Sequence, residues 1–253
     1  MTSSTSPKQA KPIHRMAWRI GVSLILLLGV GTLFVLPKFD PKSLTWPTTD
    51  PGKIAPLAMS GGNPYLRALM RTISASESND ASPYTVLYGG SHVDNLQEHP
   101  DRCIPIRWGP NQGLCTTAAG RYQFITTTWL ETAEKYHPAP TGEWMWRRYS
   151  FAPEYQDRVV HAWLDDVNYW GTDIPQLLEE GQLQTVLKRL SGTWTSLGYG
   201  IESNKVTPHL MHIYERMLAE EIALANGVPT HYLPVAHQSV EMREGLSNRS
   251  HKD

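Results

Sequence analysis

The sequence predicts a predominantly helical α+β domain that follows a single N-terminal transmembrane helix. Three observations predict this fold class. An uncharged apolar run lies near the start of the chain, and apolar residues recur at helical spacing in several later segments. A long stretch that follows the first of these helical segments is rich in Gly, Pro, Asp and Asn. With 253 residues, 40% of them hydrophobic, the chain can form one good-sized core with tails beside it.

The apolar run covers residues 20–36, and it reaches the roughly 20 residues that span a hydrocarbon core when residues 16–18 are added. Four basic residues and no acidic residue precede it, whereas the charges that follow are mixed. The positive-inside bias therefore predicts a cytoplasmic basic segment, residues 1–17, and a signal-anchor, residues 18–37, with the rest of the chain outside. A cleaved signal peptide is the competing interpretation, but no small-x-small pair closes the run.

The segments on either side of the folded domain lack periodicity. Residues 38–62 carry several Pro, Thr, Gly and Asp and predict a linker. Residues 228–253 are polar and predict a disordered tail, because they offer little apolar surface to bury. The folded domain is therefore expected over residues 63–227.

Helical spacing begins at Asn63 and Pro64, a cap followed by a first-turn proline. Leu66, Leu69 and Ile73 then mark the buried face of the first helix. Later segments with the same rhythm predict helices around residues 129–136, 159–167 and 210–222, and shorter helices are expected near 174–180 and 182–191.

The stretch from about 81 to 118 is irregular, with at most a short strand over residues 84–88. An irregular segment of this length in a compact domain is typically functional. Cys103 and Cys115 lie within it, and an extracytoplasmic compartment favours a disulfide between them. Two isolated cysteines lack the further ligands that a zinc site needs, so we expect no metal and no other cofactor.

Composition narrows the possible partners. The formal net charge of −1 gives the chain no electrostatic reason to bind nucleic acid. Nine Trp and eleven Tyr outnumber four Phe, which suits a carbohydrate-facing cleft, because indole and phenol rings combine a flat apolar face with a polar edge.

Glu77 is the candidate catalytic residue. It follows Leu66 by eleven residues, and at about 100° per residue this places it within roughly 20° of the same helix face. Burial would raise the pKa of its carboxyl group and keep it protonated, as a general acid requires. The alternative is that the helix ends before Glu77 and the side chain lies in solvent.

Two motifs, SASESND at residues 74–80 and TTAAGRYQF at residues 116–124, resemble the lambda-type family of lytic transglycosylase endolysins. Further matches follow in the same order: TVLYGG at 85–90, Glu98-His99-Pro100, the Phe151 to Asp157 run, Trp194-x-Ser-Leu and Gly198-Tyr199-Gly200. Together they cover residues 63–225. No single motif is specific, but the ordered series is.

The resemblance implies a lysozyme-like, two-lobed domain with a small β element, and it places Glu77 where the family has its single catalytic glutamate. This family cleaves the β-1,4 bond between N-acetylmuramic acid and N-acetylglucosamine without water, giving 1,6-anhydromuramyl ends. One carboxyl group can then act as both acid and base. The expected partner is a peptidoglycan strand, and the expected location is the bacterial inner membrane, with a single membrane pass and the catalytic domain in the periplasm.

The same matches suggest five substrate-binding residues. They are Tyr122, Gln123, Gln156, Tyr199 and Trp108, the last on a loop between the cysteines that corresponds by order to a lip over the family's groove. For Tyr122 a core role is an equal alternative, Trp194 and Tyr169 are weaker candidates, and Arg121 is expected to form a structural bridge.

Two other functions stay open. Asp80 or Asp94, if placed across the groove from Glu77, would favour a muramidase that hydrolyses the same bond with water. A catalytically inactive peptidoglycan-binding module could keep the aromatic residues, but it would not need Glu77.

Overall fold

The computed structural model describes residues 54–228, except residues 108, 110, 144–145 and 200–204. All of these residues lie in one compact unit. The predicted basic segment 1–17, the predicted membrane anchor 18–37 and nearly all of the predicted tail lie outside the described residues. Among the described residues, no helix is long and apolar enough to cross a membrane.

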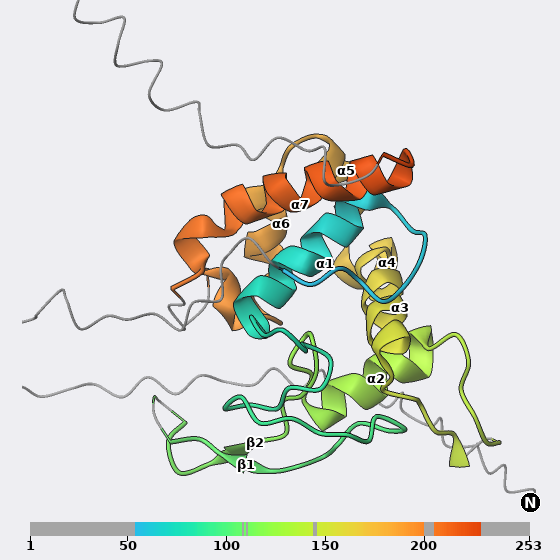
Figure 1. Ribbon diagram of the computed structural model, residues 1–253, viewed down its shortest axis with the longest axis vertical. Coiled ribbons are helices and arrows are strands. Elements are labelled where there is room, and N and C mark those ends of the chain that lie inside the picture. The colour runs from blue at the N-terminus through green and yellow to red at the C-terminus, as the bar shows by residue number, and fades with distance from the viewer. Residues whose placement is uncertain (1–53, 108, 110, 144–145, 200–204, 229–253) are drawn as a thin grey trace, which may run out of the picture. The chain divides into compact units, whose positions relative to one another are not determined.

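Helices supply most of the regular structure (Figure 1). They are α1 (Pro64–Glu77), α2 (Thr126–Tyr136), α3 (Pro153–Leu164), α4 (Val167–Trp170), α5 (Ile174–Glu179), α6 (Leu183–Leu190) and α7 (Leu210–Ala225), with short 3-10 helices η3 (Thr195–Leu197) and η4 (Thr207–His209). Each segment with helical spacing is therefore confirmed as helical, and the predominantly helical fold class is confirmed with it. The segment predicted around 159–167 is divided between α3 and α4.

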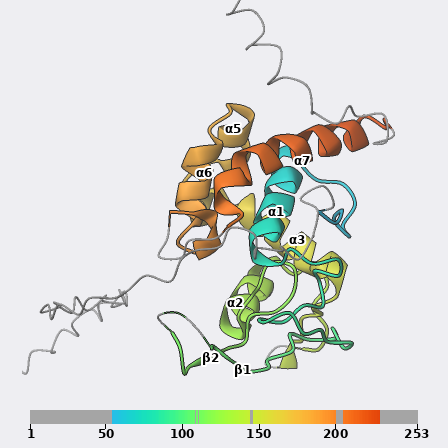
Figure 2. The ribbon, with the colours of Figure 1, turned by 60° about the vertical axis from the view of Figure 1, so that its left-hand side comes forward.

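Helix α1 is the central element of the core. The Asn63 side chain caps it by accepting hydrogen bonds from the backbone amides of Tyr65 and Leu66, as the sequence predicts. Leu66, Leu69 and Ile73 are fully buried. Helix α1 contacts α3, α5, α7 and η3, with α7 packed along its length. Figures 1 and 2 both show α1 between the group α5, α6 and α7 and the region that contains α2, β1 and β2.

Aromatic side chains continue this core toward α2 and α3. The ring of Phe124 lies with its centroid 5.4 Å from that of Trp129, and Trp163 lies 5.4 Å from both Trp170 and Trp194. These residues come from the loop before α2, from α2, α3 and α4, and from the turn before η3, so the aromatic cluster fixes how these elements meet.

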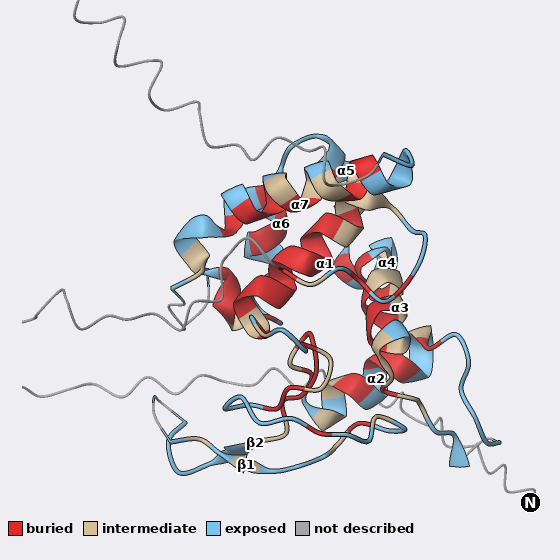
Figure 3. Cartoon of the chain, in the orientation of Figure 1, coloured by how far each residue is buried: buried red, intermediate tan, exposed pale blue. Residues whose placement is uncertain are grey.

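The β structure differs from the prediction. Residues 84–88 form no strand, because Val86 and Leu87 each make one isolated bridge, to His92 and Ala119, and no ladder continues from either. The small sheet instead pairs β1 (Ile104–Pro105) with β2 (Cys115–Thr116) in antiparallel orientation. The predicted disulfide between Cys103 and Cys115 is present beside it, with the two Cα atoms 5.3 Å apart. Figure 3 shows α1 largely buried, whereas much of the β1–β2 hairpin is exposed.

The structure also corrects the predicted linker. Its last residues, from 54 onward, pack against the helical domain, and Ile54, Leu57 and Met59 belong to the hydrophobic core. We call residues 54–61 the strap. The folded unit therefore begins before the predicted boundary at residue 63.

Candidate active site

A cleft of about 630 Å³ lies where the end of α1 meets the loop 116–125, the start of α2 and the turn into η3. Its walls combine hydroxyl, amide, carboxyl and aromatic groups. The lining residues are Ser76, Glu77, Tyr88, Thr116, Ala118, Tyr122, Gln123, Phe124, Ile125, Thr128, Glu131, Trp163, Tyr169, Gly192, Thr193, Trp194, Thr195 and Ser196. A cleft of this size and composition can hold a polar, extended ligand such as a saccharide.

Glu77 is the last residue of α1, and its half-buried side chain lines this cleft. The alternative, in which the helix ends earlier and the carboxyl group lies free in solvent, is therefore wrong. Ser196, on η3, donates a hydrogen bond from its hydroxyl to Oε1 of Glu77. A carboxyl group that is held in a cleft by a fixed donor has a defined position for proton transfer.

Small buried side chains on either side of Glu77 hold the end of α1. The Ser78 hydroxyl donates to the backbone carbonyl of Arg121 at 2.6 Å. The hydroxyls of Ser76 and Ser196 lie 2.9 Å apart, and that of Ser76 also donates to the carbonyl of Ile73. The end of α1 is thereby tied both to the loop that carries Arg121 and to η3.

Gln123 shares the cleft with Glu77. Its amide Nε2 donates to the carbonyl of Gly120 at 2.9 Å, and it lies 3.4 Å from the carbonyl of Val86. The backbone of Gln123 has φ of +48°, a left-handed conformation that residues other than Gly seldom adopt. Strain of this kind persists where the surrounding structure imposes it, and it is frequent at functional sites.

Two of the predicted substrate contacts, Tyr122 and Gln156, are fully buried, and of the two Tyr122 is among the residues that line the cleft. Tyr122 is fully buried, and its phenol donates to Oδ1 of Asp157 at 2.6 Å. Burial raises the pKa of Tyr122, as does the neighbouring Asp157, so this phenol remains a neutral donor. Gln156 is also fully buried, and its side chain bonds the backbone of Arg121, Tyr84 and Phe151. The motif match gave the positions of these residues in the chain but not the direction of their side chains.

The other predicted contacts are placed as follows. Tyr199 is exposed but is not among the cleft-lining residues. Trp108 lies outside the described residues. Trp194 is buried, with its indole donating to the carbonyl of Tyr122 at 3.1 Å, and it is among the cleft-lining residues. Tyr169, a weaker candidate, is 53% exposed and does line the cleft.

Glu131, on α2, is a cleft residue that no sequence pattern predicts. It lines the same cleft as Glu77, together with Thr128 one helical turn earlier. The spacing of Thr128 and Glu131 places them on one polar face of α2, but the sequence gives no sign that this face meets the end of α1. Neither Asp80 nor Asp94 is among the cleft-lining residues.

The side chains that line this cleft offer groups for acid–base chemistry. No group of three His, Cys, Asp or Glu side chains in the described part of the chain is arranged to hold a metal ion. Glu77 and Glu131 offer carboxyl groups, Ser196 and Thr128 offer hydroxyls, and Gln123 offers an amide.

Comparison with known proteins gives one family and two similar structures. Residues 67–220, more than half of the chain, match the family described as Endolysin. Bacteriophage lambda lysozyme complexed with a chitohexasaccharide is 19% identical with a TM-score of 0.47, over 63% of this chain and 97% of that one. A second structure of lysozyme from bacteriophage lambda is 20% identical with a TM-score of 0.45, over 65% of this chain and 96% of that one. No match is found among curated proteins.

Proposed function

Because this chain belongs to the endolysin family, we propose that it is a glycosidase that cleaves the glycan strands of bacterial peptidoglycan. The observation that carries the proposal is the position of Glu77. Its carboxyl group lies at a helix end, half-buried in a cleft whose other walls offer hydrogen-bonding groups and aromatic rings. Glycoside cleavage requires such a carboxyl group to protonate the leaving oxygen.

The specific reaction that we propose is that of a lytic transglycosylase acting between N-acetylmuramic acid and N-acetylglucosamine. Protonated Glu77 gives its proton to the glycosidic oxygen as the bond to the anomeric carbon breaks. The muramyl C6 hydroxyl attacks that carbon, and the Glu77 carboxylate takes the hydroxyl proton, which returns it to its starting state. The products are a 1,6-anhydromuramyl end and a free N-acetylglucosamine hydroxyl, with no water consumed.

The position of Glu131 supports a second candidate function, that of a muramidase, which hydrolyses the same bond with water. An inverting glycosidase needs a second carboxylate that activates water on the far side of the sugar ring. Glu131 comes from a different helix than Glu77 and lines the same cleft, so it is the described residue best placed for that role.

Digestion of purified peptidoglycan in water enriched in oxygen-18 distinguishes the two reactions. Transglycosylation gives muropeptides with anhydro ends, one water lighter and without label. Hydrolysis gives reducing ends that carry the label, and a catalytically inactive wall-binding module gives no products while still sedimenting with the wall. The transglycosylase proposal fails if wild-type protein releases labelled reducing ends. The broader glycosidase proposal fails if it releases no products.

Glu77→Gln supplies the matched control for this digestion. The amide has nearly the same shape but cannot donate and recover a proton, so we expect cleavage to fall by roughly a thousandfold or more. The thermal unfolding midpoint should change little, because the side chain is half-buried and not in the core. A Glu77→Gln protein that cleaves at the wild-type rate would contradict the assignment of Glu77.

We further propose that residues 18–37 anchor the enzyme in the bacterial inner membrane with the folded unit in the periplasm. The charge distribution around this segment supports the proposal. The disulfide between Cys103 and Cys115 is consistent with an oxidising compartment.

A further inference from the structure

The strap, residues 54–61, precedes the residues that match the endolysin family, yet buried side chains from inside that match bind its backbone. Three of its apolar residues belong to the core, Ile54, Leu57 and Met59. The carbonyls and amides of the strap are bound by two charged side chains that the fold buries, Arg121 and Asp157.

The first set of contacts runs through Arg121, which is fully buried. Its guanidinium donates from Nη2 to the carbonyl of Ala55 at 2.6 Å and from Nη1 to the carbonyl of Pro56 at 2.8 Å. The backbone carbonyl of Arg121 in turn accepts the hydroxyl of Ser78. One residue therefore joins the strap to the residue that directly follows Glu77.

The second set runs through Asp157, also fully buried. Its Oδ2 accepts the backbone amides of Ala58 at 2.7 Å and Met59 at 3.1 Å, while Oδ1 accepts the phenol of Tyr122. The carbonyl of Tyr122 accepts the indole of Trp194, which lines the cleft. This set ends in the turn from which Ser196 reaches Glu77.

Tyr84 connects the two sets. Its hydroxyl donates to Oδ2 of Asp157 at 2.7 Å and accepts from Arg121 at 2.9 Å. Burial raises the pKa of Tyr84 far above the ordinary value, so the phenol stays neutral and keeps donating. Without the strap, a buried carboxylate would lose two amide donors and a buried guanidinium would lose two acceptors, a costly change in a low-dielectric interior.

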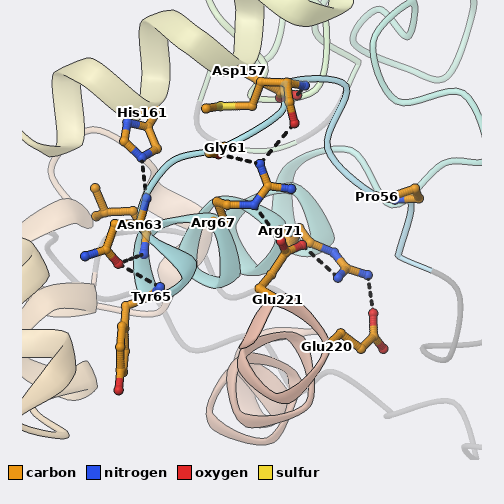
Figure 4. Close-up of polar contacts among 12 residues, drawn as sticks. Pro56, Gly61, Asn63, Tyr65, Arg67, Arg71, Asp157, His161, Glu220 and Glu221 are labelled. Carbon is orange, nitrogen blue, oxygen red and sulfur yellow. Dashed lines mark hydrogen bonds and ion pairs between the residues drawn. The ribbon is translucent and has the colours of Figure 1, made fainter. Parts of the chain in front are cut away.

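The C-terminal half of the strap is held to α1 (Figure 4). Arg67 donates to the carbonyls of Met59 at 3.0 Å and Gly61 at 2.9 Å, and its Nε pairs with Glu221 of α7 at 2.6 Å. Arg71 donates to the carbonyl of Ile54 at the other end. Arg71 and Arg67 therefore hold the two ends of the strap, and Arg121 and Asp157 bind the residues between them.

We propose that the strap is part of the catalytic unit and that Arg121 and Asp157 are positioning residues. Through their contacts with the strap they hold the loop 120–123, the end of α1 and the turn into η3 in fixed positions relative to one another. This inference rests on the proposed glycosidase function. It predicts that loosening the strap lowers the rate of cleavage, because the Glu77 carboxyl group loses its fixed position relative to the bound strand.

The test uses the full chain with Arg121→Lys and, as the matched control, Arg158→Lys. Lysine keeps the charge but lacks the planar fork with which arginine reaches the two carbonyls from two separate nitrogens. Arg158 lies beside Asp157 on α3, but within the described part of the chain its ion pair is a partly exposed i,i+4 contact with Glu154, so its replacement should leave activity and exchange unchanged. For Arg121→Lys we expect kcat to fall on the order of ten- to a hundredfold with KM within about twofold.

Hydrogen exchange supplies a measurement that does not depend on activity. In Arg121→Lys the amides of Ala58, Met59 and Ser78 should exchange on the order of tenfold faster, while amides in the middle of α1 stay protected. The proposal is overturned if kcat is unchanged, if Ser78 is unaffected when the strap amides open, or if exchange rises uniformly because the whole domain is destabilised. If wild-type protein cleaves nothing, the glycosidase proposal fails, and the exchange pattern alone then decides whether the strap holds the cleft.

Discussion

The position of the Glu77 carboxyl group depends on Ser196. Glu77 ends α1 with its side chain half-buried in the cleft. The hydroxyl of Ser196, on η3, donates to Oε1 and helps to define where the carboxyl group points. In the proposed reaction Glu77 gives and regains a proton, and both transfers require a carboxyl group with a defined position relative to the bound strand.

Ser196→Ala should therefore lower the rate of cleavage. Loss of the donor frees the carboxyl group to move, so we expect activity to fall on the order of tenfold. Ser191→Ala is the control, since Ser191 is equally buried but bonds the carbonyl of Lys188 outside the cleft. Identical rates of peptidoglycan cleavage for both variants would remove Ser196 from the site.

Gly120 is the glycine on which the loop 120–123 depends. Its φ is +73°, and an added Cβ would lie 2.3 Å from Oε1 of Gln156 and 2.8 Å from the ring of Phe151. Gly120→Ala should lower the free energy of unfolding by about 3–5 kcal/mol. Gly171→Ala, with φ of +64° and no atom nearby, should cost only about 1–2 kcal/mol. Thermal or denaturant unfolding measures both, and equal losses would contradict the close packing at Gly120.

At the scale of elements, the helices follow from the sequence, but the β structure and the strap do not. Helices of eight or more residues show several turns of periodic apolar residues, as α1 and α7 do. Strands β1 and β2 are two residues long, too short for a pattern. In the strap, Ile54, Leu57 and Met59 stand among Pro and Gly, a composition that resembles a linker. Its packing could not be predicted because the residues that it contacts lie far along the chain.

The candidate site could likewise be predicted only in part, because some of its residues are brought together only by the tertiary fold. Glu77 could be predicted because it lies on a periodic helix and within a recognisable motif. Glu131 and Ser196 could not, since only the tertiary fold brings α2 and η3 to the end of α1. The roles of Tyr122 and Gln156 could not be predicted, because a motif does not distinguish a side chain that lines a cleft from one that supports it.

His161 joins α3 to the start of α1. Its Nε2 accepts the backbone amide of Asn63 at 3.2 Å, and an added Cβ on Gly62 would lie 2.6 Å from the same nitrogen. Burial lowers the pKa of His161, and nearby Arg67 lowers it further, while Asp165 opposes the shift. The folded chain thus holds the neutral imidazole, which can accept this hydrogen bond.

This pKa shift predicts the direction of a pH effect on stability. As pH falls below the ordinary value of about 6.5, the unfolded chain takes up the proton before the folded one does, so stability is lost until the lower folded pKa is reached. His161→Gln keeps an acceptor at every pH and should reduce the fall in Tm between pH 7 and 5. Part of the fall in Tm should remain in this variant, because burial also lowers the pKa values of His99 and His137. Exposed His212→Gln is the control, and an unchanged slope in His161→Gln would contradict the role of His161.

At the scale of the whole molecule, the proposed anchor determines where the enzyme acts. The full chain should sediment with bacterial membranes and resist extraction by salt, because an apolar span of about 20 residues is held by the hydrocarbon core. A chain that lacks residues 1–37 should be soluble and keep its activity on isolated peptidoglycan. Recovery of the full chain in the soluble periplasmic fraction would instead support a cleaved signal peptide.

The contacts of Asp157 also determine where a recombinant fragment should start. A fragment cut at the matched family boundary would begin at Arg67, within the first turn of α1. It would lack the Asn63 cap and would expose a carboxylate that the native chain keeps dry. Such a fragment would be prone to aggregate for reasons unrelated to its catalytic residues, whereas one starting at or before Ile54 keeps the interior closed.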